Sequence, residues 1–478
     1  MTTQRTYPKA RIGLFAVGLA AYWPQFAGLK ERLQGYTAHV ETQLAAFADV
    51  INIGLVDTPQ AAYAAGNTLA AAQVDLLICH TATYATSSQV LPIVQQAKVP
   101  VIVLNLQPSA ALEYEQTDTG EWLANCSTCC VPEISNAFHR AGIEFQVVSG
   151  MLYDDARVWR ELHEWCRAAS AKRVLSGARF GFLGHTYPGM LDMYSDFAQH
   201  HAQLGLHVEV LEMCDLAERV QQVQPAEIAA KRDEAYATFE IADNVAHDDL
   251  QWACRVAAGL DRLVADYELA ALAYYYRGAP QSEYERLGAG LILGNTLLTA
   301  RGIPASGEGD LKNAVAMKVM DVLGAGGSYT EFYAMDFRED FVLMGHDGPG
   351  HIAISDGKPI LRGLGLYHGK AGFGVSVEFS VKQGPVTIFG CTQTRDGRLK
   401  FMAAQGEAIP GPILRIGNTN SRIRFALPPA EFVDAWCAHA PTHHCALGLG
   451  HLAPVLAKFA RLQGLEFAHV ASPLTLLR

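Results

Sequence analysis

The sequence lacks the features that would direct it to a membrane or to nucleic acid. No apolar run reaches the roughly 20 residues that a transmembrane helix needs. Basic residues are in deficit, with 37 Lys and Arg against 48 Asp and Glu and a formal net charge of −11. A nucleic-acid-binding domain usually carries a basic patch, so this balance argues against such a partner. We therefore expect small molecules or protein subunits as partners, and neither nucleic acid nor a membrane.

The N-terminus also lacks a convincing secretory leader. Its apolar part is short and runs into AAYWPQFAGLKERL, which predicts a first strand and the turn into a helix. We therefore expect a cytoplasmic protein, in which the ten cysteines, mostly isolated in apolar segments, are reduced core residues. Internal repeats and low-complexity tracts are absent too. The 478 residues exceed what one core usually serves, so two or three domains are expected.

Apolar runs alternate with amphipathic segments in the first third of the chain. Repeated βα units predict a parallel sheet with helices on both faces, and ligands of such sheets bind at the carboxyl ends of the strands. The expected strands are 11–17, 50–56, 74–80 and 99–106, and the expected helices are 28–47, 58–72 and 87–97.

The remainder of the chain predicts two further regions. ARFGFLGHTYPGM (178–190) indicates a strand and a Gly/Pro turn, and opens a second α/β region with strands near 207–213 and 269–276. After residue 326, short alternating strands with Gly/Asp turns predict an antiparallel sheet or barrel. The predicted domains are 1–172, 173–325 and 326–478.

Two acids share one cramped turn in ASGEGDLKNAVAMKVMDVLG (305–324). Asp310 is placed to cap a helix over 311–323, because an Asp at that position accepts a backbone N–H of the first turn. No cap needs Glu308, which lies between two glycines. It is either a solvated loop acid or a carboxylate aimed into a site, with the glycines allowing close approach.

Further acids and imidazoles lie at the ends of predicted elements. Glu331 follows a Gly-Gly break in GGSYTEFYAMDF, MGHDGPGH carries His346 and His351, and THHCALGLGH carries His443 and His444. Taken singly, each is more often an ordinary polar residue, with Glu331 as a surface acid of an edge strand. Two carboxylates and two imidazoles together form a ligand set that suits Mn²⁺, Co²⁺ or Zn²⁺.

The cysteines of NCSTCCVPE (125–133) are a separate oddity. A zinc site would need a second Cys or Cys/His pair at matching spacing, and none is clear. Three roles stay open for the cluster of Cys126, Cys129 and Cys130: a nucleophilic or redox cysteine, the lining of a pocket, or structure.

The set of acids and histidines resembles the L-arabinose isomerase and L-fucose isomerase superfamily, and its arabinose-isomerase branch in particular. In that family the metal ligands are a Glu in an EGD turn that opens a helix, a second Glu, a His, and the second His of an HH pair. Here GEGDLKNA offers Glu308, SYTEFY offers Glu331, DFVLMGHD offers His346 and PTHHCA offers His444, matching in order and in spacing.

The resemblance implies an α/β fold with three parts: an N-terminal flavodoxin-like domain, a second α/β domain and a C-terminal β-rich, barrel-like domain. It also implies a homotrimer or homohexamer in which Tyr22, Trp23, Tyr84 and Cys126–Cys130 of one subunit cap the pocket of another. Leu311 stands where the arabinose branch usually has Trp, and the sugar-contacting N-terminal segments differ. L-Arabinose itself is therefore not the expected substrate.

The predicted function is a metal-dependent aldose–ketose isomerase that works through a cis-enediol on an unphosphorylated sugar. Glu308 and Glu331 would serve as acid and base, and Mn²⁺, with Co²⁺, Mg²⁺ or Zn²⁺ as alternatives, as the Lewis acid. A sugar epimerase or sugar-acid lyase on the same metal site, and a non-enzymatic sugar-binding protein, are the alternatives. Further candidate substrate contacts are His185, Tyr187, Met190, His351, His443, Asn420 and Arg422.

Overall fold

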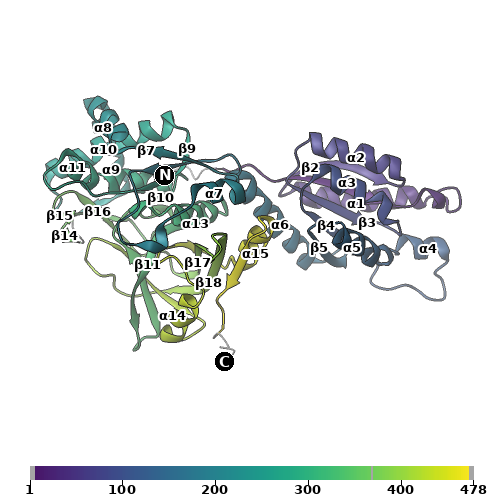
Figure 1. Ribbon diagram of the computed structural model, residues 1–478. Coiled ribbons are helices and arrows are strands. Elements are labelled where there is room, and N and C mark those ends of the chain that lie inside the picture. The colour runs from purple at the N-terminus through teal and green to yellow at the C-terminus, as the bar shows by residue number, and fades with distance from the viewer. Residues whose placement is uncertain (1–5, 368–369, 473–478) are drawn as a thin grey trace. The chain divides into compact units, whose positions relative to one another are not determined.

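The computed structural model describes residues 6–367 and 370–472 (Figure 1). The chain forms two compact units, an N-terminal unit of Tyr7–Arg173 and a C-terminal unit built on Val174–Arg478. Each unit has its own sheets and its own apolar core. Within the described residues, no helix is long and apolar enough to cross a membrane.

The N-terminal unit is a five-stranded parallel sheet in the order β2-β1-β3-β4-β5, the doubly wound order of flavodoxin-like domains. Its strands are β1 Arg11–Val17, β2 Asp49–Val56, β3 Leu76–Thr81, β4 Val101–Gln107 and β5 Phe145–Met151. Its helices are α1 Leu29–Ala45, α2 Pro59–Ala71, α3 Leu91–Ala97, α4 Thr119–Ala124, α5 Val131–Arg140 and α6 Ala156–Leu175, which runs on into the C-terminal unit. These elements confirm the parallel α/β fold that was predicted for the first third of the chain.

The sequence explains the burial of this sheet. Every residue of β3 is buried, as expected for a central strand whose two faces are both covered by helices. Apolar side chains such as Phe15, Leu77 and Phe138 fill the space between strands and helices. Thr58 caps α2 by accepting the backbone N–H of Ala61 at 3.2 Å.

The C-terminal unit begins with a four-stranded parallel sheet in the order β10-β9-β6-β7. Its strands are β6 Arg179–Leu183, β7 His207–Leu211, β9 Leu269–Tyr274 and β10 Ala305–Ser306. The helices of this part are α7 Phe197–Leu204, α8 Met213–Gln222, α9 Pro225–Thr238, α10 His247–Asp266, α11 Glu283–Ala289, α12 Leu291–Ala300 and α13 Leu311–Val322.

An antiparallel barrel of six strands follows in the same unit. Its order is β17-β20-β11-β12-β19-β18, and pairing between β17 and β18 closes the ring. A further strand, β21, runs parallel to β18 beside its first half. The bounds are β11 Gly326–Asp336, β12 Phe341–His346, β17 Gly384–Gln393, β18 Leu399–Ile409, β19 Thr419–Phe425, α14 Pro429–Cys437, β20 Cys445–Leu449, α15 Ala453–Leu462 and β21 Glu466–His469.

Two small sheets complete the unit, in the order β16-β13-β8 and as the pair β14-β15. Their strands are β8 Glu240–Ile241, β13 Ile360–Gly363, β14 Leu366–Tyr367, β15 Lys370–Ala371 and β16 Val375–Glu378. The predicted fold class, α/β with two parallel-sheet regions and a C-terminal antiparallel barrel, is confirmed.

Helix α13 joins the parallel sheet to the barrel. It is buried along almost its whole length and contacts β9 of the sheet as well as β11, β17 and β20 of the barrel (Figure 1). Asp310 caps it by accepting the backbone N–H of Asn313 at 3.0 Å, as the sequence predicts. The division into three domains stays a prediction.

The expectation of reduced cysteines is wrong for one pair. Cys126 and Cys129 form a disulfide in the N-terminal unit, while the other eight cysteines are free. Six of these eight are buried, and Cys214 and Cys437 are exposed.

Candidate functional site

Glu308 lies in a strained turn at the carboxyl end of β10. It has φ +62°, in the left-handed region that residues with a Cβ seldom adopt. Its carboxylate is buried, and among the described residues no group is within hydrogen-bonding distance of Oε2. A solvated loop acid would be exposed, so this burial favours a carboxylate aimed into a site.

The neighbouring loop holds this turn in place. The backbone N–H of Tyr187 donates to the carbonyl of Glu308 at 2.8 Å. Gly309 has φ +72°, and a Cβ there would lie 2.5 Å from the carbonyl oxygen of His185. Only glycine fits this close approach, which explains the second glycine of the GEGD turn.

The barrel brings three more predicted residues beside Glu308. Strand β11 is paired with β12 on one side, where Glu331 is opposite Gly345, and with β20 on the other, where Thr330 is opposite Cys445. His346 ends β12 and His444 immediately precedes β20. The strand register therefore brings the Glu331 carboxylate, from the middle of β11, beside the imidazoles at the end of β12 and just before β20.

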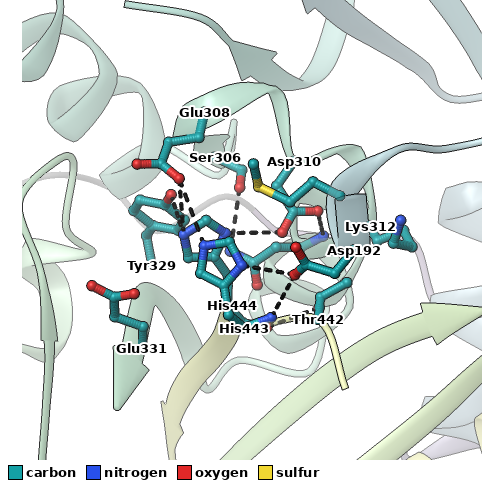
Figure 2. A network of polar contacts seen from close by, with 12 residues as sticks. Asp192, Ser306, Glu308, Asp310, Lys312, Tyr329, Glu331, Thr442, His443 and His444 are labelled. Atoms are coloured by element: carbon teal, nitrogen blue, oxygen red, sulfur yellow. Dashed lines mark hydrogen bonds and ion pairs between the residues drawn. The ribbon is translucent and has the colours of Figure 1, made fainter. Parts of the chain in front are cut away.

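The side chains of these residues converge, and Figure 2 shows Glu308, Glu331 and His444 among them. The Nε2 atoms of His346 and His444 are 3.1 Å apart. Glu308 Oε2 lies 3.6 Å from His444 Nε2, and Glu331 Oε1 lies 3.8 Å from His346 Nε2. All four residues named by the sequence pattern thus meet around His444.

Asp310 and Tyr329 fix the orientation of His444. Asp310 caps α13 through Oδ1, while its Oδ2 lies 3.0 Å from His444 Nδ1. The Tyr329 hydroxyl lies 2.8 Å from His444 Nε2. Because a carboxylate only accepts, Nδ1–H donates to Asp310, which leaves Nε2 as the acceptor and therefore the nitrogen able to bind a metal.

The two glutamates have opposite pKa shifts. Burial raises the pKa of Glu308. The imidazoles of His443, His444 and His346 together lower this pKa by more than burial raises it, so the net shift is downward. Burial raises the pKa of Glu331, and His346 offsets this only in part, so the net shift is upward. Opposed shifts in two neighbouring carboxyl groups are typical of an acid and base pair.

His443 belongs to a second pair beside the same carboxylate. Its Nδ1 and its backbone N–H lie 2.7 and 2.9 Å from Asp192 Oδ2, and its Nε2 lies 3.6 Å from Glu308 Oε2. Burial lowers the pKa of His443, but Asp192 and Glu308 raise it to about 10. Asp192 could not be identified from the sequence, because it lies 251 positions before His443 and no local motif links them.

A pocket opens onto this cluster. Its polar lining includes Glu308, Tyr329, His346 and Asp347, and its walls are aromatic or aliphatic. Tyr329 could have been found from the sequence, since it lies two residues before Glu331 and so on the same face of β11. The other lining residues include Tyr274, Tyr276, Arg277, Glu285, Ala289, Ile292, Leu364 and Phe373.

Several predicted contacts lie away from the four clustered residues. His185 packs its ring on Tyr275 with centroids 3.9 Å apart, and Met190 lies farther along the same loop. The Tyr187 hydroxyl accepts a hydrogen bond from Arg277 at 3.0 Å, at the side of the pocket. His351 pairs with Asp321 at 3.3 Å in the core.

Two other candidates have structural partners in the barrel. The Asn420 side chain bonds to backbone groups of Leu414 and Asn418, and Arg422 pairs with Glu339 at 3.1 Å. Neither of the two lines the pocket.

The remaining candidates belong to the N-terminal unit. Tyr22 and Trp23 follow the carboxyl end of β1, and the Trp23 indole N–H donates to Asp57 at 2.8 Å. Cys126 is buried and bonded to Cys129. That these residues cap the pocket of a second copy of the chain stays a prediction.

The clustered side chains fit a divalent cation. Two imidazoles and two carboxylates match the mixed N/O ligands preferred by Mn²⁺, Co²⁺ and Zn²⁺. Glu308 Oε2 is buried without a hydrogen-bond partner in the described part of the chain, which would be costly without a counter-charge. Both groups of described residues that could hold a metal ion include His444.

The chain is similar to known proteins over most of its length. The family model for the L-arabinose isomerase central domain matches residues 195–326. A protein of Nocardioides sp. named L-arabinose isomerase is 24% identical over 395 residues, covering 79% of this chain and 76% of that protein. A protein of the same name from Herpetosiphon aurantiacus is 25% identical over 393 residues, covering 78% and 75%.

A solved structure is also similar, at a level that carries no argument. It is a periplasmic solute-binding protein of an ABC transporter from Actinobacillus succinogenes with bound D-allose. The identity is 15%, the match covers 57% of this chain and 79% of that one, and the TM-score is 0.18.

Proposed function

Since this chain is a divergent arabinose-isomerase-like protein, we propose that it is a metal-dependent aldose–ketose isomerase acting on a sugar other than L-arabinose. The observation that supports this most is the convergence of Glu308, Glu331, His346 and His444 around one point, where Glu308 and His346 also line the pocket. Glu308 follows β10, Glu331 lies in β11, His346 ends β12 and His444 precedes β20, and these strands meet only in the folded C-terminal unit.

The reaction moves a proton between two neighbouring sugar carbons through a cis-enediol. It needs one group that removes the proton from carbon and another that protonates the neighbouring position. Glu308 and Glu331 would supply these groups. Both lie beside the two imidazoles, so a substrate bound there would have a carboxylate within reach on each side.

The same four side chains would hold the cation, with Mn²⁺ as the proposed metal and Co²⁺, Mg²⁺ or Zn²⁺ as alternatives. When bound, a divalent cation would act as a Lewis acid toward the negative charge that develops on the substrate oxygens. Asp310 keeps His444 Nε2 available as a ligand. His443, oriented by Asp192, would donate to a substrate hydroxyl.

The pocket favours an uncharged sugar. Among the described residues that line it, Arg277 is the only Lys or Arg, and three acids, Glu285, Glu308 and Asp347, share the same lining. A phosphorylated sugar would need several cations at one end of the pocket. The aromatic walls formed by Tyr274, Tyr276 and Phe373 suit the apolar faces of a sugar ring and limit the access of water.

We also propose a homotrimer or homohexamer in which Tyr22, Trp23 and Cys126 of a second copy complete the pocket. This follows from the resemblance to the arabinose-isomerase family. Light scattering during gel filtration measures the mass of the assembly, and a monomer at micromolar concentration would exclude the arrangement.

The function is tested with a panel of unphosphorylated aldoses and ketoses in D₂O, followed by NMR. With Mn²⁺ present, we expect at least one aldose–ketose pair to interconvert with deuterium entering the carbon next to the carbonyl. Chelation should stop the reaction, and added Mn²⁺ should restore it.

Other outcomes separate the rival activities. Deuterium exchange that inverts the carbon without forming a ketose would indicate an epimerase, and loss of water from a sugar acid would indicate a lyase. Sugar binding with no exchange in any sample would indicate a binding protein. Glu331→Gln serves as the matched inactive control in every sample.

A further inference from the structure

Three cysteines lie together at the start of helix α5 in the N-terminal unit. Cys126 and Cys129 form a disulfide across two intervening residues, with Cα atoms 5.9 Å apart. Cys130 follows directly and is buried. The segment lies on the chain between β4 and β5, and the proposed isomerase chemistry uses none of its thiols.

Neither a metal site nor a stabilising cross-link accounts for this disulfide. The groups of described residues that could hold a metal ion lie around His444 and include no cysteine. A disulfide stabilises a fold by closing a loop, and the effect grows with loop length, so a loop this short stabilises least. A Cys-x-x-Cys disulfide is instead the arrangement used in thiol–disulfide exchange.

The other cysteines show what sets this pair apart. Cys214 and Cys437 are exposed and free, and Cys130 directs its thiol to the backbone carbonyls of Thr83 and Ser127 at 3.6 Å. Burial raises the pKa of Cys130 to about 11, which keeps that thiol protonated and unreactive. One disulfide in a chain of otherwise free thiols is the pattern of a redox-active pair, not of a disulfide-built fold.

The two sulfurs differ in access. Cys129 is exposed, whereas Cys126 is only 3% exposed. An external thiol therefore reaches Cys129, and Cys126 is the sulfur that leaves.

We propose that Cys126 and Cys129 form a reversible dithiol–disulfide site whose reaction partner is a dithiol reductant. The thiolate of the reductant attacks Cys129 Sγ, which forms a mixed disulfide and breaks the bond to Cys126. Cys126 leaves as a thiolate and takes up a proton. The second thiol of the reductant then attacks the reductant sulfur that is bonded to Cys129. The reductant is thereby oxidised to an internal disulfide, and Cys129 is released as a thiol.

The proposal is tested on the full chain by a redox titration. The protein is equilibrated in buffers with increasing ratios of reduced to oxidised dithiothreitol, quenched with acid, alkylated after denaturation and mapped by mass spectrometry. We expect Cys126 and Cys129 to pass together from unalkylated to alkylated, with the slope of a two-electron couple. Cys214 and Cys437 should be alkylated at every ratio.

Two results would overturn the proposal. One is that Cys126 and Cys129 are fully alkylated even in the most oxidising buffer. The other is that they stay unalkylated in the most reducing buffer while the chain keeps its native circular dichroism. The readout is mass and needs no substrate, so the outcome is independent of the proposed isomerase activity.

Single variants test which sulfur is attacked. With oxidised glutathione as the probe, native Cys126→Ser should gain one adduct at position 129, while native Cys129→Ser should gain none at position 126. Cys214→Ser is the matched control and should form the internal disulfide as the wild type does. Equal adducts at 126 and 129 would contradict the assigned direction of attack, and the titration of the wild type stands even where a variant fails to fold.

Discussion

The two units present the carboxyl edges of two parallel sheets, and these edges differ in chemistry. In the N-terminal unit, β1 and β3 lead into loops with Tyr22 and Tyr84, and Cys126 follows α4, which lies on the chain between β4 and β5. In the C-terminal unit, β10 leads into the turn with Glu308, and β9 leads to the pocket residues Tyr276 and Arg277. The N-terminal edge carries aromatics and cysteines, whereas the C-terminal edge carries a buried carboxylate beside two imidazoles.

This difference comes from what is joined to each sheet. A parallel sheet places loops at one edge, but it contributes only Glu308 to the four clustered residues. The barrel contributes Glu331, His346 and His444, and α13 connects the two parts within one unit. The edge of a parallel sheet therefore provides a binding position, and the strands of the barrel are needed to bring the histidine and glutamate side chains together there.

Removing either carboxylate of the cluster should have the largest effect. We expect Glu308→Gln and Glu331→Gln each to lower the isomerase rate by about a thousandfold or more, because each removes a proton-transferring group and a metal ligand. Glu407→Gln, on the half-exposed β18 position, is the control and should keep full activity. Near-normal rates in either cluster variant would remove these residues from the mechanism.

A smaller loss is expected when the carboxylate that orients His444 becomes an amide. Asn caps helices as well as Asp, so Asp310→Asn keeps the cap of α13 while removing the charged partner of His444 Nδ1. Mn²⁺ affinity should fall by about 10- to 100-fold, as measured by calorimetry. Asp118→Asn makes the same change at the cap of α4, where no imidazole is bonded, and should leave the affinity unchanged.

Acid should lower the stability of both units to a similar extent, whereas the two predictions above affect only the site in the C-terminal unit. Burial lowers the pKa of His80 in the N-terminal unit to about 4, and burial lowers that of His200 in the C-terminal unit to about 4. An unfolded histidine has a pKa of about 6.5, so the unfolded chain binds the proton first as the pH falls. The contribution of each neutral histidine to the free energy of unfolding is fully present above about pH 6.5 and is lost as the pH falls from about 6.5 to 4. From pH 7 to pH 5 the loss is about 2 kcal/mol per histidine.

Hydrogen exchange read separately for β3 and β6 measures this loss in each unit. His80→Gln should flatten the pH dependence of protection in β3 and leave that of β6 as in the wild type. An unchanged slope in β3 would show that His80 is protonated in the folded state.

The smallest predicted effect is confined to the N-terminal unit. Thr58→Ala removes the hydroxyl that caps α2 and should destabilise that unit by about 1 kcal/mol. Urea unfolding monitored through the N-terminal unit measures this change, and the isomerase rate at low urea should not differ from that of the wild type. A large loss of activity would mean that α2 also supports the pocket.

Local patterns predicted much of the fold. The strand expected at 11–17 is observed as β1, and the helix expected at 311–323 is α13, because both rest on hydrophobic periodicity and on a cap within a few residues. Between its two glycines, Glu308 was either a solvated loop acid or a carboxylate aimed into a site. Its burial favours the second alternative, and its role as a metal ligand stays a prediction.

Contacts between distant strands could not be predicted in the same way. Nothing near Asp192 in the sequence points to His443, and only the folded chain brings the two together. Asn420 and Arg422 were candidate sugar contacts, with a strand-end salt bridge as the alternative. In the barrel Asn420 bonds to a backbone loop and Arg422 pairs with Glu339. The disulfide was also missed, because a short Cys-x-x-Cys is equally compatible with free thiols.

The central claim is that Glu308, Glu331, His346 and His444 hold one divalent cation at the pocket. Electron paramagnetic resonance of free Mn²⁺ measures this directly, because the signal of the hydrated ion falls as the protein binds it. We predict one Mn²⁺ bound per wild-type chain, and a loss of that binding in both Glu308→Gln and His444→Gln. No binding to the wild type, or equal binding by the two variants, would contradict the account.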